Sequence, residues 1–308
     1  MSDNPWAASA VISSWNKIED VRKNLDALRK QKLPFDEIVL VDNASDDGTA
    51  EMVRRDYPEV KLVVMPHSQY GACETFNLGF STAQYPLVAI LDDDVVLPPE
   101  WLETLVAKFK AEPETTAILS TKVVEPEMPD WFKDHPEVNR EKFMGTFRGC
   151  GSLARHEVIE KAGYYDEKFF IYGNERDLTA RVLNLGYRVK QVPEVVTFHG
   201  TPFGMKMGKR SLYFHVRNLW WFLFKYVPVS QIIGFWFGLV FGGLFKKKKS
   251  GDAKSEGVGA IGAAKNVFGT KGGVWIVFKA TFHAFLGIGH CLKHRKVCKA
   301  EDFSLPDH

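Results

Sequence analysis

Three consecutive carboxylates, Asp92 to Asp94, end the apolar run that begins near Leu87. Adjacent anions repel one another unless a cation or hydrogen-bond donors offset their charge. Alternation along an extended chain turns Asp92 and Asp94 to the same side. Hard oxygen ligands suit Mg2+ or Mn2+, and these ions commonly keep coordination positions that substrate phosphates fill. The run therefore predicts a divalent-metal site at the end of a buried strand, with a solvated acidic loop as the alternative.

The elements that would position these carboxylates are short apolar strands alternating with amphipathic helices. A polar turn, Asp42 to Thr49, follows the second strand, so both acidic clusters lie at strand ends. This alternation predicts an α/β fold with a parallel sheet, in which ligands gather at the carboxyl ends of the strands. Strands are expected over residues 7–13, 37–41, 60–65, 87–91 and 117–124, and helices over residues 19–29, 50–56, 75–81 and 101–109.

The pattern is less regular after the fifth strand. Residues 125–143 are rich in Pro, Asp and aromatic side chains, which indicates an excursion over the surface. Regular structure is expected again over residues 147–155, in helices over 157–162 and 174–185, and in strand-like pieces over 189–193 and 195–199.

Composition limits the classes of function. With 308 residues and 45% hydrophobic side chains, the chain can bury a real core. A formal charge of +2 favours no nucleic-acid partner. The N-terminal residues show no signal peptide, so we expect a cytoplasmic catalytic part. Four cysteines in a chain of this length form no disulfide framework, which fits a reducing compartment.

The C-terminal third has a different character. Residues 227–245 carry no charged side chain, and four lysines follow at 246–249. A membrane span needs about 20 apolar residues, and a single crossing would leave these lysines on the far side, against the positive-inside tendency. We therefore favour an interfacial or re-entrant helix over a span. Membrane contact is expected through residues 217–249 and 274–292, at the inner face of the cell membrane.

This character suggests a division of the chain into four parts. We expect a catalytic domain over residues 1–212, an aromatic and apolar helix with its lysine run over 213–249, a linker over 250–273, and a second apolar helix with a basic tail over 274–308. The tail holds residues that could be drawn as a zinc cluster, but an amphipathic basic tail explains them more simply. They are His290, Cys291, His294 and Cys298.

Four motifs, in order along the chain, resemble one known family. They are the turn Asp42 to Thr49, Gly71 with Asn77 and Gly79, the carboxylates Asp92 to Asp94, and Asn174-Glu175-Arg176-Asp177. Over residues 7–200 the ordered set is similar to family 2 glycosyltransferases, and it is nearest to the rhamnosyltransferase-like branch, whose members modify bacterial surface polysaccharides. The resemblance implies a GT-A fold with a Rossmann-like mixed sheet flanked by helices, and a divalent cation, Mg2+ or Mn2+. It also implies inverting transfer of a sugar, with rhamnose as one candidate, from a dTDP- or UDP-sugar to a glycan or lipid-linked acceptor in cell-surface polysaccharide synthesis.

The resemblance assigns Asp42 to the nucleotide base. The chemistry agrees, because a carboxylate can accept the N3 hydrogen of uracil or thymine, which cytosine lacks; a helix cap is the alternative. Arg148 is expected near the acceptor. The other residues expected to contact the nucleotide sugar are Ser13, Asn43, Asp46, Gly71, Asn77, Asp92 and Asp93.

Asp94 is the expected direct metal ligand, with Asp92 at the metal or its bound water. His199, at the end of the last strand, matches a family position that can supply another ligand, although a histidine after an apolar strand is often structural. Inverting transfer also needs a carboxylate that removes the acceptor hydroxyl proton. Glu175 and Asp177 compete for this role. Glu175 stands where the family usually has Asp, and we expect it to be the base, with Asp177 in support.

Other classes of protein compete with this interpretation. Asp92-x-Asp94 also matches the nucleophile motif of haloacid-dehalogenase-like phosphatases, but that motif normally follows the first strand. A nucleotidyltransferase would need a Gly-rich basic loop after the first strand, which residues 11–17 do not offer. The remaining alternative is a membrane-associated, non-catalytic scaffold that binds sugars or nucleotides.

Overall fold

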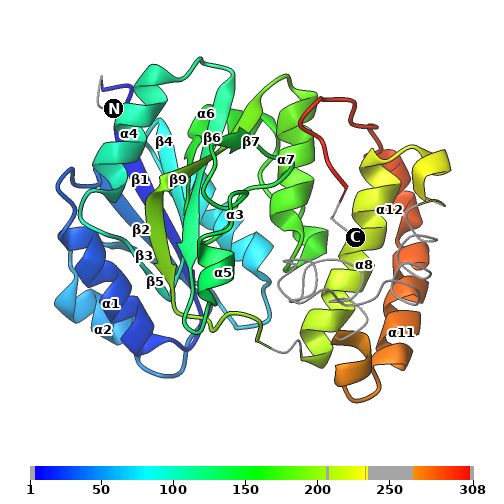
Figure 1. Cartoon of the computed structure of the whole chain (residues 1–308). Helices are drawn as coiled ribbons and strands as arrows, with labels where there is room; N and C mark the ends of the chain where they lie inside the picture. Colours follow the sequence, from blue (N-terminus) through cyan, green and yellow to red (C-terminus); the bar gives the residue numbers. More distant parts are fainter. Residues whose placement is uncertain (1–3, 206–207, 233, 235–265, 306–308) are drawn as a thin grey trace.

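The computed structural model describes residues 4–205, 208–232, 234 and 266–305. Within this part of the chain, nine strands form one sheet (Figure 1). The strands are β1 Ala8–Ser14, β2 Glu37–Asp42, β3 Lys61–Val64, β4 Leu87–Asp92, β5 Val95–Val96, β6 Thr116–Val124, β7 Lys142–Phe143, β8 Ser152–Arg155 and β9 Arg188–His199. The helices are α1 Ile18–Arg29, α2 Thr49–Asp56, α3 Ala72–Thr82, α4 Trp101–Ala111, α5 Asp130–Lys133, α6 His156–Lys161, the short 3-10 helix η1 Glu167–Phe169, α7 Asn174–Asn184, α8 Lys209–Tyr226, α11 Gly273–Leu286 and α12 Ile288–Lys293.

The sheet is mixed, as the family resemblance implies. Its strand order is β3-β2-β1-β4-β8-β6-β9-β5, and β7 also pairs with β9. Strands β1 to β4 are parallel where they pair, whereas β8 runs antiparallel to both β4 and β6. Strand alternation predicted a parallel sheet, and the strands β1 to β4 on which that prediction rested are parallel. The sheet as a whole is mixed because β8 enters it between β4 and β6 in the opposite direction.

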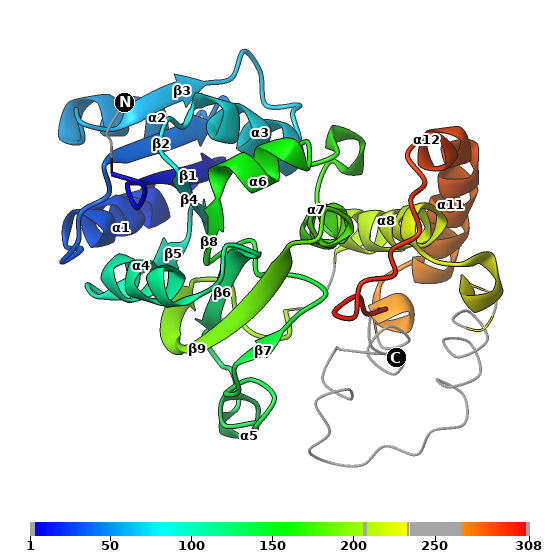
Figure 2. The same ribbon diagram turned by 90° about the horizontal axis from the view of Figure 1, so that it is seen from above.

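Helices cover both faces of the sheet, because successive side chains of each strand point to opposite faces. In β1, Val11 packs on one face, whereas Ala10 and Ile12 pack on the other. The face that holds Val11 is covered by α3, α6, α7 and α8, and the opposite face by α1, α2 and α4 (Figure 2). Two separate apolar cores therefore hold the sheet edge in a fixed position between helix layers.

Most predicted elements lie within two or three residues of their observed positions. The two strand-like pieces expected over 189–193 and 195–199 form the single strand β9, with a register shift opposite Thr121 and Lys122 of β6. The excursion over residues 125–143 contains the short helix α5 and reaches the short strand β7.

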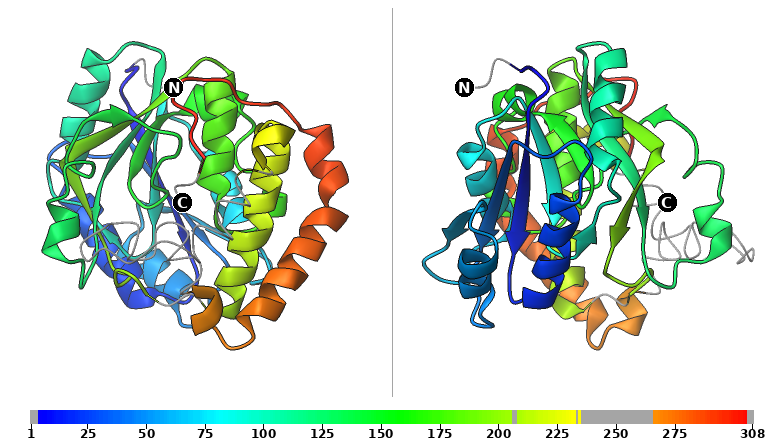
Figure 3. Two further views of the ribbon diagram at one scale, coloured as in Figure 1. Left: turned by 45° about the vertical axis from the view of Figure 1, so that its right-hand side comes forward. Right: turned by 90° about the vertical axis from the view of Figure 1, so that its left-hand side faces the viewer.

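Helix α8 continues through residue 212, where the sequence suggested the end of the catalytic domain. It lies between α7 and α11 (Figure 3). The side chains of Trp221, Phe222 and Leu223 are buried in the same core as Val11. The sequence predicted membrane contact over residues 217–249. For the residues of this range that lie in α8, the prediction is corrected, because these aromatic side chains pack inside the protein.

No helix in the described ranges combines the length and the apolar character needed to cross a bilayer. Of the apolar segment 227–245, only residues 227–232 and 234 are described, and the lysines at 246–249 lie outside the described residues. Most of the expected linker, residues 250–265, also lies outside them.

Candidate active site

Strand register brings the predicted acidic residues to one edge of the sheet. Ser13 of β1 lies opposite Asp92 of β4, and Ser14 lies opposite Asp42 of β2. Because these three strands are parallel, their carboxyl ends meet at this edge. The turn after β2 and the acidic run after β4 are thus neighbours, although 50 positions separate Asp42 from Asp92.

Asp92, Asp94 and His199 form the centre of the site. The Nε2 atom of His199 lies 3.2 Å from an oxygen of Asp94 and 3.8 Å from an oxygen of Asp92. Asp93 turns the other way and accepts a hydrogen bond from the backbone N–H of Trp15. Asp93 and Asp94 form the turn between β4 and β5, so this turn, and not the alternation of an extended chain, brings Asp94 to the same side as Asp92. Two carboxylates and one imidazole nitrogen are a donor set that fits Mn2+ or Mg2+.

Glu125, which follows β6 directly, orients the imidazole. Its carboxylate lies 3.0 Å from Nδ1 of His199, so Nε2 faces the aspartates. A carboxylate on the far nitrogen is the usual support of a metal-binding histidine. Burial lowers the pKa of His199, but hydrogen bonds to Asp94 and Glu125 outweigh burial and raise this pKa to about 10. The site thus attracts positive charge strongly.

The neighbouring acids show the same crowding of negative charge. Burial, together with repulsion from Asp94 and Glu175, raises the pKa of Asp92 to about 6. Burial and repulsion from its two neighbours raise the pKa of Asp93 to about 7. A bound cation would offset this repulsion, as the sequence argument anticipated.

Cys150 is also at this centre. Its sulfur, one oxygen of Asp92 and one ring nitrogen of His199 lie within 4.8 Å of one another. The structure gives the site a soft donor beside its hard ones.

Asp42 lies beside this centre, at the end of β2. Its side chain is fully buried, and one carboxylate oxygen accepts a hydrogen bond from the backbone N–H of Ser45. Its other oxygen is buried without a hydrogen-bond partner in the described structure. Buried acceptors are usually satisfied, so this oxygen fits a donor that a ligand brings. The cap alternative belongs to another residue, because Asp47 accepts from the backbone N–H groups of Thr49 and Ile18.

The remaining residues expected at the nucleotide fall into different environments. The hydroxyl of Ser13 bonds that of Thr75 on α3, at 2.7 Å. Asn43 is buried, and its amide donates to the carbonyl of Tyr70. Asp46 is exposed at the tip of the turn.

Gly71 and Asn77 of the second motif contact the segment that precedes α7. A Cβ atom on Gly71 would lie 2.4 Å from the carbonyl oxygen of Phe170, so only glycine fits without displacement. The amide of Asn77 bonds both the N–H and the carbonyl of Tyr165. The expectation that Asn77 contacts the donor is corrected, because its amide is engaged in holding this segment.

Glu175 opens α7 at the same edge. Its carboxylate accepts a hydrogen bond from Asn174 at 3.1 Å and packs against Gly149, where a Cβ atom would lie 2.5 Å from it. Burial raises the pKa of Glu175. Arg148, next to Gly149, has an exposed side chain.

Asp177, the other candidate base, is fully buried. One of its oxygens accepts from Lys225 and Tyr226, and the other accepts from both nitrogens of the Arg181 fork. A carboxylate with these partners has no free position for an acceptor hydroxyl. Of the two carboxylates that competed for the role of base, Asp177 is therefore set aside, and its supporting role stays the prediction.

The family model described as "Glycosyl transferase family 2" matches residues 9–180, which is more than half of the chain. The chain belongs to glycosyl transferase family 2. The matched range contains every predicted site residue except His199. Because family membership is shown, the phosphatase alternative is set aside, and Asp92 indeed follows β4 instead of the first strand.

Two curated relatives show how far the sequence of this chain differs from those of other glycosyltransferases. The chain is 25% identical over 224 residues to "Probable glycosyltransferase YdaM" of Bacillus subtilis, an alignment that covers 66% of this chain and 53% of that protein. It is 24% identical over 214 residues to "Glycosyltransferase AglE" of Haloferax volcanii, which covers 66% of this chain and 70% of that protein. The chain thus spans about half the length of the Bacillus relative.

Solved structures share the fold. The mannosyltransferase PcManGT from Pyrobaculum calidifontis, in complex with GDP-Man and Mn2+, has a TM-score of 0.54 at 20% identity, over 92% of this chain and 75% of that one. GalNAc-T7 with UDP, GalNAc and Mn2+ has a TM-score of 0.61 at 14% identity, over 91% of this chain and 57% of that one. These likenesses confirm the α/β core of mixed sheet and flanking helices that the family 2 resemblance implied.

Some site residues were missed by the reasoning from sequence. Glu125 and Cys150 were not expected at the metal centre, nor was Thr201, whose hydroxyl donates to Asp94 at 3.0 Å. Lys17 was not expected there either, although its amine lies 3.8 Å from Asp94. Position at a strand end could have indicated Glu125, since it follows β6 as Asp92 closes β4.

Proposed function

We propose that this family 2 chain is a metal-dependent inverting transferase that moves a sugar, with rhamnose as one candidate, from a dTDP- or UDP-sugar to a glycan or lipid-linked acceptor in cell-surface polysaccharide synthesis. The observation that supports this function best is that three groups with different proposed roles lie at one edge of the sheet. These are the unsatisfied oxygen of Asp42, the acidic centre around Asp94, and the carboxylate of Glu175.

The donor base is assigned from Asp42. Its unpartnered, buried oxygen can accept the N3 hydrogen of uracil or thymine. Guanine also carries a ring N–H, so a GDP-sugar is the competing donor. Because the ends of β1 and β4 are neighbours, the pyrophosphate of such a donor would lie beside Asp92 and Asp94.

Asp92, Asp94 and His199 would hold the cation, with Glu125 fixing the imidazole. When bound, Mg2+ or Mn2+ would stabilise the negative charge that develops on the departing nucleoside diphosphate. Glu175 would take the proton from the acceptor hydroxyl as the sugar is attacked from the opposite face. A raised pKa suits a general base that must also release its proton near neutral pH.

The exposed face of α11 supports the proposal of an acceptor at a membrane surface. Four large side chains repeat along one exposed face of this helix, at positions 275, 278, 282 and 286, and exposed lysines accompany them. A contiguous apolar face of this kind is uncommon on a protein that contacts only water. A lipid-linked acceptor at the inner face of the cell membrane would then lie on the side of the molecule that carries α11.

The test is binding of UDP, dTDP and GDP to the purified chain by calorimetry, with and without Mn2+, followed by turnover of the matching nucleotide sugars. We expect tight binding of UDP or dTDP that depends on Mn2+. Asp94→Asn should remove the dependence on Mn2+ and abolish turnover, whereas Asp130→Asn, at an exposed position, should change neither. Absence of any nucleotide binding would exclude a transferase, and binding without turnover of any sugar would favour the scaffold alternative.

A further inference from the structure

The segment from Tyr165 to Gly173 connects the two halves of the proposed site. Within the segment, the carbonyl oxygen of Phe170 accepts a hydrogen bond from the backbone N–H of Cys73 and lies against Gly71 on the donor side. At its C-terminal end, the segment leads directly into α7, which begins with Asn174 and Glu175. A shift of this segment would therefore move the donor side and the base relative to one another.

This segment has an unusual backbone. Phe170 and Tyr172 have φ angles of 68° and 65°, and Gly173 has a φ of 75°. The left-handed region is unfavourable for bulky residues such as Phe and Tyr. Conformations of this kind persist only where the surroundings impose them, and they cluster at functional sites. The segment must therefore be held by contacts from outside itself.

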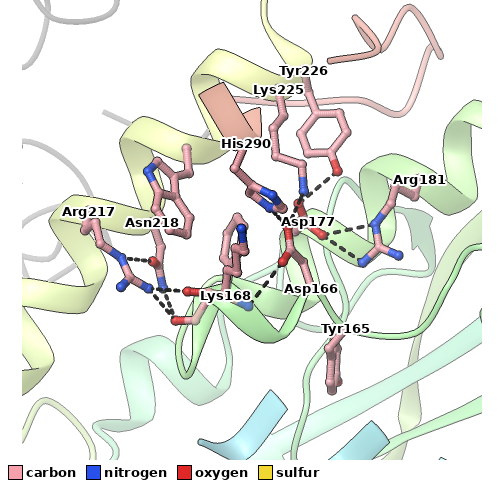
Figure 4. Close-up of polar contacts among 12 residues, drawn as sticks. Tyr165, Asp166, Lys168, Asp177, Arg181, Arg217, Asn218, Lys225, Tyr226 and His290 are labelled. Atoms are coloured by element: carbon pink, nitrogen blue, oxygen red, sulfur yellow. Dashed lines mark hydrogen bonds and ion pairs between the residues drawn. The ribbon is translucent and has the colours of Figure 1, made fainter. Parts of the chain in front are cut away.

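Helix α8 supplies the first set of these contacts (Figure 4). The side-chain amide of Asn218, which is buried, donates to the carbonyls of Phe169, Ile171 and Tyr172 at 2.7 to 3.0 Å. The adjacent Arg217 donates to the carbonyls of Lys168 and Phe169, each at 2.8 Å. Two consecutive side chains thus hold the backbone of four residues between Lys168 and Tyr172.

About two turns further along α8, Lys225 supplies the second set (Figure 4). Its side chain is only 2% exposed and bonds both Asp166, at 3.0 Å, and the buried Asp177. Asp166 also pairs with His290 of α12 at 2.6 Å. A buried charge network of this kind costs desolvation and is a weak source of stability compared with apolar packing. Its value here is geometric, because it fixes the start of the segment to the first turn of α7.

We propose that Asn218 and Lys225 are positioning residues, which hold the segment 165–173 so that Glu175 and the donor side of the site stay in productive register. This inference rests on the proposed function, because it takes Glu175 as the base. It makes the C-terminal helices part of the catalytic apparatus. A misplacement of about 1 Å in such a geometry can reduce turnover about 100-fold.

The experiment compares Asn218→Ala with Asn184→Ala in the full chain. Asn184 is a matched control, because its amide also joins α7 to the C-terminal part of the chain, through the carbonyl of Lys296, at the opposite end of α7. The measurements are kcat, the KM of the donor, the Kd of the nucleoside diphosphate with Mn2+, and the melting temperature. Activity is measured well below the lowest melting temperature, so that unfolding does not contribute.

We expect Asn218→Ala to lower kcat about 100-fold while the nucleotide Kd stays within about twofold of wild type. Asn184→Ala should keep the wild-type kcat. A merely structural role would lower nucleotide affinity and kcat together, or would leave both unchanged, and either result overturns the inference. Lys225→Met should reproduce the kcat loss, since it removes the charge that joins Asp166 to Asp177.

Should Asn218→Ala fail to fold, Arg217→Gln decides the matter, because Arg217 is only partly buried and bonds the same segment. We expect a loss of kcat of about tenfold at unchanged nucleotide affinity, and an unchanged kcat would refute the inference. Failure of the proposed function is distinguishable, since the wild-type chain itself would then bind no nucleotide and transfer no sugar.

Discussion

Glu175 determines the pH dependence of the proposed transfer. Burial raises the pKa of this carboxyl above that of an ordinary glutamate, and only its ionised form can take a proton. Transfer should therefore decline as the pH falls through this raised pKa, at a higher pH than for an exposed glutamate. We expect kcat/KM, measured across the acidic range, to show this displaced limb, and Glu175→Gln to lower kcat by about 100-fold or more.

The control for this prediction is the affinity of the nucleoside diphosphate measured at the same pH values. Asp92 and Asp93 also have raised pKa values, so a loss of donor affinity could imitate the limb. The acidic decline in activity can be assigned to the base if it is still seen at saturating concentrations of the donor and is absent from the residual activity of Glu175→Gln. A Glu175→Gln variant with full activity would assign the proton transfer to another group.

Cys150 predicts a preference among metals. Its sulfur lies within 4.8 Å of ligand atoms of Asp92 and His199, and thiolates prefer soft ions. We expect Cd2+ to bind with the ultraviolet absorption of a cadmium–thiolate bond, and Cys150→Ser to lose this band while Mn2+ binding remains. The other three cysteines are buried and should give no background. A band that persists in Cys150→Ser would place the cadmium elsewhere.

The sequence predicted the site residues unevenly, and the reason is local. Asp92, Asp94 and His199 lie at strand ends, and strand ends can be recognised from an apolar run that stops. Glu125 follows a strand end in the same way, whereas Cys150 approaches the same point from a segment that no local pattern places there. Asp177 is the opposite case, a residue that the sequence suggests for catalysis and the structure does not. An acid in the first turn of a helix resembles a catalytic group in the sequence, but this one is paired with Lys225 and Arg181.

At the scale of elements, the turn after β2 joins two helices through Asp47. Its carboxylate accepts from the N–H of Thr49 at the start of α2 and from the N–H of Ile18 at the start of α1. Loss of such a cap costs ~1–2 kcal/mol of stability. We expect Asp47→Ala to lower the free energy of unfolding by about this amount in a urea titration. The neighbouring Asp46→Ala, at an exposed position, should lower it by much less, and equal losses would show that Asp47 does not cap these helices.

Helices and strands of the first half could be predicted because each buries one face. Val21, Leu25 and Leu28 of α1 recur at helical spacing and are all buried. The direction of β8 could not be predicted, because the side-chain pattern of a four-residue strand does not show which way the strand runs in the sheet. Pairing with β4 and β6 decides that direction, and pairing depends on the whole sheet.

At the scale of the whole molecule, hydropathy could not show which of the two apolar C-terminal helices is buried and which is exposed. Both α8 and α11 are rich in aromatic side chains. Helix α8 buries Trp221 and Phe222 in the core, whereas α11 leaves Trp275 and Phe278 largely exposed, at 73% and 67%. Only the packing of α8 between α7 and α11 distinguishes the core helix from the one that faces outward.

This exposed face of α11 predicts binding to anionic lipid. Aromatic side chains enter the interface, and the exposed lysines at 271, 279 and 293 are attracted to negative headgroups. We expect the chain to co-sediment with vesicles of phosphatidylglycerol and phosphatidylcholine, less so at high salt, and weakly with phosphatidylcholine alone. Replacing Trp275 and Phe278 together by serine should weaken binding at least about tenfold, because burying each ring is worth more than 1 kcal/mol.

The matched control replaces Leu185, an exposed apolar residue at the end of α7, by serine, and should bind vesicles as wild type does. Sedimentation of the protein without lipid tests the competing occupant of the face, a second copy of the chain. A dimer that dissociates in the Trp275 and Phe278 variant, together with no vesicle binding by wild type, would assign the face to self-association. Because the apolar face is formed by α11 while the carboxylates lie at the sheet edge, loss of vesicle binding should leave nucleotide affinity unchanged, which separates membrane contact from the chemistry of transfer.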